Sequence, residues 1–136
     1  MYSIEEDIKY LTELIRKYPK IKEFRLIRAK LHVVLCQYNK AINDYERVTD
    51  NYLCIAPITI CKKYNLVEET KRCYEREMRE DKDNYMNYTS RAYFYKDIGE
   101  KAKALNDCKI ALKLCPKNEF VISSIKELIR KINKIK

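Results

Sequence analysis

The sequence predicts an all-α protein, and its composition and hydrophobic periodicity both lead to that fold class. The 136 residues include one glycine, Gly99, and three prolines, which leaves little for hairpin turns or glycine-rich phosphate loops. Residues that favour helices, such as Lys, Glu, Leu, Ile and Ala, dominate instead. The length is typical of one domain with its own core, so we expect a single domain over residues 1–136.

An internal repeat is the third observation, and it is clearest near the C-terminus. Aromatic and small residues follow one another there at the spacing of two helices joined by a turn, namely Tyr88, Arg91, Ala92, Tyr95, Gly99, Ala104, Cys108, Ala111 and Pro116. The same order occurs earlier in the chain, in Arg25, Arg28, Ala29, His32, Cys36, Ala41, Ile42, Asp44, Tyr45 and Val48. Alanines on both helices of a pair let the two helices approach closely.

This spacing resembles that of the tetratricopeptide repeat (TPR) family. The resemblance extends over nearly the whole chain and is strongest in residues 22–48 and 85–116. It implies an α-solenoid of antiparallel helix pairs, about eight helices in all, which stack into a right-handed superhelix.

The expected elements follow in chain order. Residues 1–19 form a half repeat, in which Ile8, Leu11, Leu14 and Ile15 give one apolar helical stripe. Residues 20–52 form a full repeat. Residues 53–84 form a shortened repeat whose first helix begins near Pro57. Its second helix runs through Glu68, Glu69, Thr70, Tyr74, Glu77 and Met78.

Residues 85–118 form another full repeat, and residues 119–136 form a capping helix. The cap is expected because an apolar stripe is surrounded by basic residues, and a solenoid needs a terminal helix with a polar outer face. The stripe consists of Ile122, Ile125, Leu128, Ile129 and Ile132, and the basic residues are Lys126, Arg130, Lys131 and Lys134. The alternative is a basic amphipathic helix that binds a membrane or nucleic acid.

Two Arg–Asp pairs recur at the same positions of the two full repeats. Arg28 and Asp44, like Arg91 and Asp107, are sixteen residues apart, which predicts a bridge between the two helices of each repeat. The arginines could instead contact a ligand. Because each has a matched acid, we interpret them as structural pairs.

No motif for catalysis is present, so we expect a protein that is not an enzyme and has no cofactor. The sequence contains no phosphate loop, GxSxG, HExxH or calcium loop, and its one histidine, His32, falls on a core position. The six cysteines form no CxxC, and we expect reduced, buried thiols. Three close spacings, His32 to Cys36, Cys54 to Cys61 and Cys108 to Cys115, would permit metal binding, but the paired signature of a zinc site is absent.

The TPR resemblance implies a scaffold or adaptor that binds a peptide or partner protein on a concave face lined by the first helix of each repeat. Tyr88 and Tyr95 are expected in the core, which leaves Tyr93 to meet a ligand. Position by position, the concave residues are Glu23, Leu26, Ile27, Lys30, Val33, Val34, Thr59, Lys62, Met86, Thr89, Ser90, Tyr93 and Lys96.

One well-defined TPR subfamily binds the C-terminal carboxylate of chaperone tails through lysine, asparagine and arginine side chains. This sequence has Leu26 and Lys30, then Ala56, then Met86 and Ser90 at those positions. It departs at every one, which argues against a chaperone tail as the partner.

The net charge of +9 favours an acidic partner, and it leaves a nucleic-acid or anionic-surface binder as the alternative function. Tyr85, Tyr88, Tyr93 and Tyr95 among basic residues would suit base stacking. No apolar run is long enough to span a membrane, and the first ten residues carry acidic side chains where a signal peptide has an apolar core. We therefore expect a cytoplasmic protein. The sequence specifies no oligomeric state.

Overall fold

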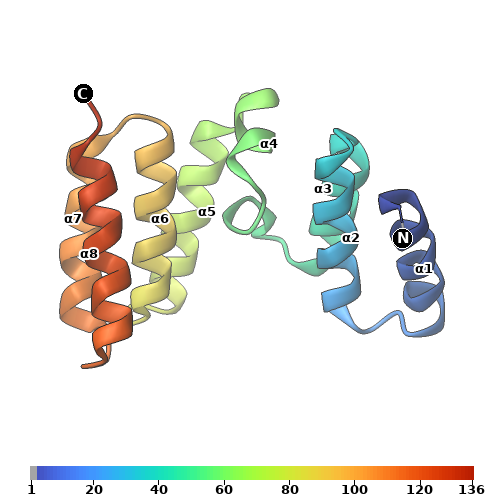
Figure 1. Cartoon of the computed structure of the whole chain (residues 1–136), viewed down its shortest axis with the longest axis horizontal. Helices are drawn as coiled ribbons and strands as arrows, with labels where there is room; N and C mark the ends of the chain where they lie inside the picture. The colour runs from blue at the N-terminus through green and yellow to red at the C-terminus, as the bar shows by residue number, and fades with distance from the viewer. Residues whose placement is uncertain (1–2) are drawn as a thin grey trace. The chain divides into compact units, whose positions relative to one another are not determined.

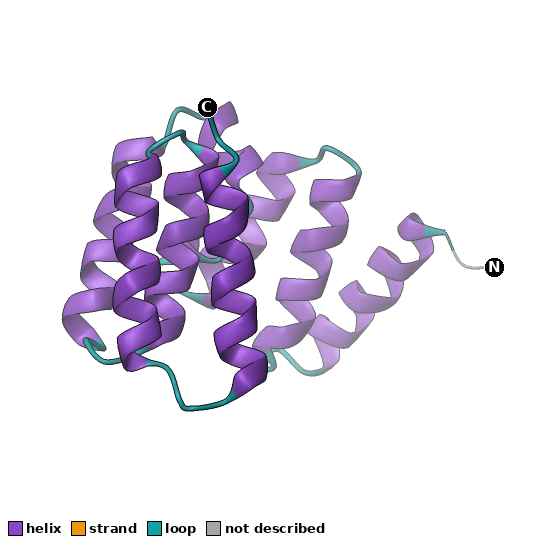
Figure 2. Cartoon of the chain, turned by 60° about the vertical axis from the view of Figure 1, so that its left-hand side comes forward, coloured by secondary structure: helices purple, strands orange, loops and turns teal. Residues whose placement is uncertain are grey.

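The computed structural model describes residues 3–136, and these residues form eight α-helices and one short 3-10 helix, with no strand (Figures 1 and 2). The predicted all-α class is confirmed. None of the helices in this part of the chain is both long and apolar enough to cross a membrane. The elements are α1 (Ile4–Lys17), α2 (Lys22–Val34), α3 (Tyr38–Val48), η1 (Tyr52–Cys54), α4 (Ile58–Lys63), α5 (Val67–Glu80), α6 (Tyr85–Asp97), α7 (Lys101–Leu114) and α8 (Glu119–Asn133).

The chain divides into two compact units, where the sequence suggested one domain. The first unit ends at Tyr64 and holds α1 to α4, and the second unit, Asn65–Lys136, holds α5 to α8. The boundary falls inside the expected shortened repeat, between α4 and α5. That repeat has a first helix of only six residues, which begins directly after Pro57.

The helices of the two units follow one register. A single sequence offset carries both ends of α1 onto the ends of α5, and the same offset carries both ends of α2 onto the ends of α6. It also carries the start of α3 onto the start of α7. The interval from the start of α6 to the start of α8 equals the interval from α1 to α3. This interval is one repeat length, so α8 has the position of the first helix of a further repeat.

The turn that follows α2, α4 and α6 is also repeated. A residue with positive φ lies two positions after the end of α2, α4 and α6: Cys36 (φ 58°), Asn65 (φ 54°) and Gly99 (φ 82°). Gln37 N and Glu100 N, the next residues after two of them, donate to the carbonyls of His32 and Tyr95. A left-handed residue with such a hydrogen bond is a common way to end a helix.

Small residues form the centre of each core. Ala29 and Ala41 in the first unit, and Ala92 and Ala104 in the second, have no exposed surface. They lie in the two hydrophobic clusters that join α2 to α3 and α6 to α7, where a larger side chain would separate the helices. The first cluster also contains Tyr45 and Ile60, and the second contains Cys108, Ala111, Ile125, Leu128 and Ile132.

The terminal helices follow the predicted stripes. Leu11 and Ile15 are the buried residues of α1, and Ile8 and Leu14 are half-buried. In α8, the predicted stripe is divided: Ile125, Leu128 and Ile132 are buried in the core, while Ile122 and Ile129 are half-buried. Of the basic residues named for α8, Lys126, Lys131 and Lys134 are exposed, and Arg130, whose side chain is 54% exposed, bonds Glu127 at the surface. Basic side chains therefore face the solvent along α8, and the role of this helix as a cap stays a prediction.

Candidate interaction surfaces

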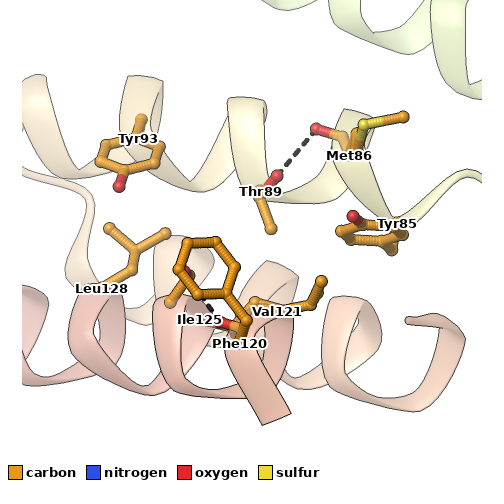
Figure 3. Close-up of a pocket in the computed structure, with 9 residues that line it drawn as sticks. Tyr85, Met86, Thr89, Tyr93, Phe120, Val121, Ile125 and Leu128 are labelled. Carbon is orange, nitrogen blue, oxygen red and sulfur yellow. Dashed lines mark hydrogen bonds between the residues drawn. The ribbon is translucent and has the colours of Figure 1, made fainter. Parts of the chain in front are cut away.

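An apolar groove lies between α6 and α8 in the second unit, and Figure 3 shows side chains of the two helices facing each other across it. Its volume is about 270 Å³. Three of its large side chains are well exposed, Phe120 (81%), Met86 (55%) and Tyr93 (46%). We call this the α6–α8 groove, and its lining residues are Tyr85, Met86, Thr89, Tyr93, Phe120, Val121, Ser124, Ile125 and Leu128.

Helix caps fix the backbone at one end of the groove. The Asn84 side chain accepts a hydrogen bond from Met86 N (3.0 Å), which holds the start of α6. The Asn118 side chain accepts hydrogen bonds from Phe120 N (2.9 Å) and Val121 N (3.3 Å), which holds the start of α8. Asparagine at this position satisfies backbone N–H groups that have no partner within the helix. The apolar side chains of the rim are therefore carried on ordered backbone.

The floor of the groove belongs to the core of the second unit. Ile125 and Leu128 are 3% and 1% exposed, and both pack in the cluster that also contains Ala92 and Cys108. Thr89 has its hydroxyl turned back to the Met86 carbonyl (2.9 Å), so its methyl group is left for the groove (Figure 3). The groove thus joins a rigid apolar floor to an exposed apolar rim.

The structure brings some of the predicted concave residues of α6 together and leaves others apart. Met86, Thr89 and Tyr93 line the α6–α8 groove. Ser90 is exposed outside it, and Lys96 is half-buried with its ammonium 3.4 Å from an Asp97 carboxylate oxygen.

Sequence reasoning missed the second wall of the groove, because the stripe of α8 was interpreted as a cap or as a basic amphipathic helix, and neither interpretation placed Phe120 beside α6. Phe120 lies one repeat length after Met86 and so has the same position in the repeat. That offset was the signal that could have identified Phe120 as a surface residue of the same kind.

The predicted residues of the first unit form a mixed surface on α2. Glu23, Ile27, Lys30 and Val34 are exposed and lie on one stripe of the helix, with Ile27 47% and Val34 62% exposed. Leu26 and Val33 are different, because both are half-buried and pack against the core of that unit. On α4, Lys62 is exposed and Thr59 is also open to solvent.

Both predicted Arg–Asp pairs form, with nearly identical geometry. The guanidinium of Arg28 donates to the two carboxylate oxygens of Asp44 at 2.8 and 2.6 Å, and that of Arg91 donates to Asp107 at 2.8 and 2.7 Å. The aspartates are 2% and 1% exposed. The hydrogen bond to each carboxylate raises the pKa of its arginine.

Neighbouring groups further enclose the two arginines. Arg28 also donates to the Thr12 hydroxyl of α1 at 3.1 Å. Arg91 lies over the rings of Tyr88 and Tyr95, 5.9 and 5.5 Å from their centroids. Both tyrosines are half-buried against the core, in the positions expected from the repeat. With their charges paired in this way, the arginines have the surroundings of structural residues.

The closely spaced cysteine and histidine residues do not lie on shared helical faces. His32 is buried in α2 and its Nδ1 donates to Gln37 Oε1 (2.8 Å), whereas Cys36 lies beyond the end of that helix and is exposed. Cys54 lies in η1 and Cys61 in α4, and Cys115 follows the last residue of α7. Within residues 3–136, no three His, Cys, Asp or Glu side chains are grouped closely enough to hold a metal ion.

The expectation of buried thiols holds for half of the cysteines. Cys61, Cys73 and Cys108 are buried, Cys54 and Cys115 are half-buried, and Cys36 is exposed. Burial raises the pKa of Cys108 to about 11, with a smaller contribution from the adjacent Asp107. The Cys108 thiol is therefore protonated at neutral pH and acts as a small apolar side chain.

No protein-family model matches the chain, and no curated protein sequence matches it.

Proposed function

We propose that this protein is an interaction module, not an enzyme, and that it binds an apolar segment of a partner protein in the α6–α8 groove. The observation that carries the proposal is the exposure of Phe120, Met86 and Tyr93 around a groove with a buried apolar floor. Aromatic and methionine side chains with this combination of exposure and support are typical of binding hot spots. The TPR resemblance supports the same function, because helix pairs of that family bind peptides.

The size of the groove suits one or two anchoring side chains. Covering an exposed phenylalanine or methionine on binding contributes about 2 kcal/mol for each fully buried side chain. The floor is already packed and the rim is held by helix caps, so little ordering of the protein opposes binding. The exposed stripe of α2, with Ile27 and Val34, is a second surface on which a partner could be bound in the same way.

We place this function in the cytoplasm. Cys36, Cys73, Cys108 and Cys115 carry free thiols, and Cys36 is exposed. Exposed thiols are kept reduced by cytosolic thiol systems and are rare in oxidising compartments.

The test begins with partners captured from cells by the tagged full-length chain and then measures binding of one purified partner. The double variant Met86→Ala, Phe120→Ala should weaken its affinity by at least about tenfold, the loss expected for two anchor residues. Tyr18→Ala is the matched control, because Tyr18 is also an exposed aromatic residue (45%) but lies in the first unit. Circular dichroism should show equal helix content in all three proteins.

The salt dependence of the same interaction distinguishes binding in the apolar groove from the alternative function. Binding in an apolar groove changes little between low and moderate salt. A steep loss of affinity with salt, together with no effect of the two groove substitutions, would favour binding of nucleic acid or another anionic surface through the net charge of +9.

A further inference from the structure

Within the described residues, one repeat is represented only by its second helix, α1, and another is represented only by its first helix, α8. α1 shares the register of the second helices, since it begins one repeat length before α3, and its two ends match those of α5 at the offset between the two units. α8 shares the register of the first helices, since it begins one repeat length after α6. Each of these two helices therefore has one face that a partner helix covers in the other repeats.

The exposed side chains of α1 show which face is uncovered. Tyr10 is 67% exposed, whereas Asp44 and Asp107, which occupy the same position of the repeat, are 2% and 1% exposed. Asp7, three residues earlier on the same face, is also exposed, although Ala41 at its position has no exposed surface.

The corresponding face of α8 carries a lysine between two isoleucines. Lys126 is exposed and stands at the position of Ala92, which has no exposed surface. Ile122 and Ile129 lie one turn before and after it, on the same stripe, and both are half-buried. Like the outer face of α1, this face combines a charge with apolar neighbours.

Lys126 of α8 and Asp7 of α1 carry opposite charges and occupy positions that face each other in the full repeats. In each full repeat, the two alanines at these positions lie in one core cluster across the helix pair: Ala29 with Ala41, and Ala92 with Ala104. If α8 of one molecule pairs with α1 of another in the same way, Lys126 lies opposite Asp7. An ion pair would replace the contact between alanines, flanked by Ile122 and Ile129 on one side and by Tyr10 on the other.

The charges at the helix ends agree with this antiparallel pairing. The first turn of α1 carries Glu5, Glu6 and Asp7, and the last turn of α8 carries Arg130 and Lys131. In an antiparallel helix pair, the start of the second helix lies beside the end of the first helix, so these acidic and basic turns would be neighbours. Each set also has the favourable sign for the dipole of its own helix.

We propose that the protein self-associates head to tail, with the outer face of α8 of one molecule bound to the outer face of α1 of a second copy, so that the two helices complete a repeat and Lys126 pairs with Asp7. The contact is heterologous, so each assembly leaves one α1 face free at one end and one α8 face free at the other, and assembly continues beyond the dimer. Because the contact is limited to one helix of each molecule, we expect the association to be weak and dependent on concentration.

The experiment measures the weight-average mass of the full-length protein by sedimentation or light scattering, from about 5 µM to about 500 µM, since small interfaces are weak. The wild-type mass should rise with concentration past that of a dimer, and added salt should reduce it. Asp7→Lys or Lys126→Asp alone places like charges opposite each other and should weaken association by at least about tenfold. The double variant D7K/K126D, or a mixture of the two single variants, should restore it.

Matched controls change the net charge equally elsewhere. Asp83→Lys and Lys109→Asp alter exposed residues of the second unit that lie outside both faces and should leave association unchanged. A zero-length carbodiimide cross-link between Asp7 and Lys126 should be found in the dimer and larger species. The proposal is overturned by a monomeric wild type, by a mass that stops at the dimer, by failure of the D7K/K126D rescue, or by a cross-link found only in the monomer.

Discussion

At the scale of single residues, the two Arg–Asp pairs impose the strictest requirement on the sequence. Asp44 and Asp107 are almost fully buried, and each carboxylate accepts two hydrogen bonds from one guanidinium. A carboxylate or guanidinium left without its partner in such surroundings would be an uncompensated charge. The pairs therefore fix the packing of one helix of each repeat against the other.

Asp107→Asn should destabilise the protein strongly because it leaves the half-buried Arg91 without its anion. We expect a loss of about 2–3 kcal/mol in the free energy of unfolding, below the range for fully buried pairs because the Arg91 side chain is 20% exposed. Urea denaturation monitored by circular dichroism measures the loss. Glu127→Gln is the control, since Glu127 makes the same two-pronged contact with Arg130 on the surface and should change stability little. Equal effects of the two substitutions would contradict the structural role of Asp107.

The Cys108 thiol should make stability depend on pH at alkaline values. Burial raises its pKa from 9.0 to about 11, so the folded protein holds this proton more tightly than the unfolded chain. The resulting stabilisation is complete below about pH 9 and is lost as the pH rises toward 11. Between about pH 8 and about pH 10.5, the wild type should lose about 2 kcal/mol more than Cys108→Ala, which has no thiol. Urea denaturation at both values gives the difference, and parallel losses in the two proteins would refute it.

At the scale of elements, the turns after α2, α4 and α6 share one feature, a residue with positive φ two positions after the end of the helix. This left-handed position holds Cys36, Asn65 and Gly99. Glycine adopts positive φ without strain, asparagine tolerates it, and cysteine is strained by its Cβ. The same backbone thus costs a different amount of free energy in each turn.

Gly99→Ala should therefore destabilise the protein and Cys36→Gly should stabilise it, each by about 1 kcal/mol. No heavy atom lies within 4 Å of a Cβ added at Gly99, so the cost there comes from the backbone alone. Midpoints of thermal unfolding measure both changes. Gly99→Asn serves as a control, with a smaller loss than Gly99→Ala. A Cys36→Gly variant less stable than the wild type would show that the Cys36 side chain contributes more than its strain.

The helices were predictable from the sequence because they depend on local periodicity and on a repeat seen twice. The sixteen-residue spacing of Arg28 and Asp44 predicted a contact across a helix pair, and the apolar stripe of α8 predicted its buried residues. The six-residue length of α4 was not predictable. Phe94 was missed too: it is 5% exposed and its ring lies 5.5 Å from that of Tyr74, a contact between different helices that no local pattern records.

The candidate site was less predictable than the fold. The register implied by the TPR resemblance predicted that Met86, Thr89 and Tyr93 are surface residues, and these residues line the groove. It could not show that Leu26 and Val33 are half-buried against their own core, because that depends on how closely the neighbouring elements pack. Phe120 was interpreted through the role of its helix as a cap, although a cap can also form one wall of a groove.

At the scale of the whole molecule, the chain holds two cores of unequal size. The buried cluster of the second unit combines small residues of α6 and α7 with Ile125, Leu128 and Ile132 of α8. In the first unit, the main buried cluster is Ala29, Ala41, Tyr45 and Ile60, and Ile60 comes from the short helix α4. Because hydrophobic stabilisation follows the apolar area removed from water, the second unit should be the more stable of the two.

The fragment Asn65–Lys136 should therefore fold by itself, while the fragment that ends at Tyr64 should be only partly helical. Both are near the size below which a single core is marginal, so the difference in buried apolar area decides the outcome. Circular dichroism and urea denaturation of the two fragments measure helix content and cooperativity. Ile132→Ala in the larger fragment removes a side chain with no exposed surface and should cost about 2–4 kcal/mol, enough to unfold a marginal domain. An unfolded Asn65–Lys136 fragment beside a folded full-length chain would contradict the independence of its core, and a cooperative fragment insensitive to Ile132→Ala would contradict the part assigned to α8 in that core.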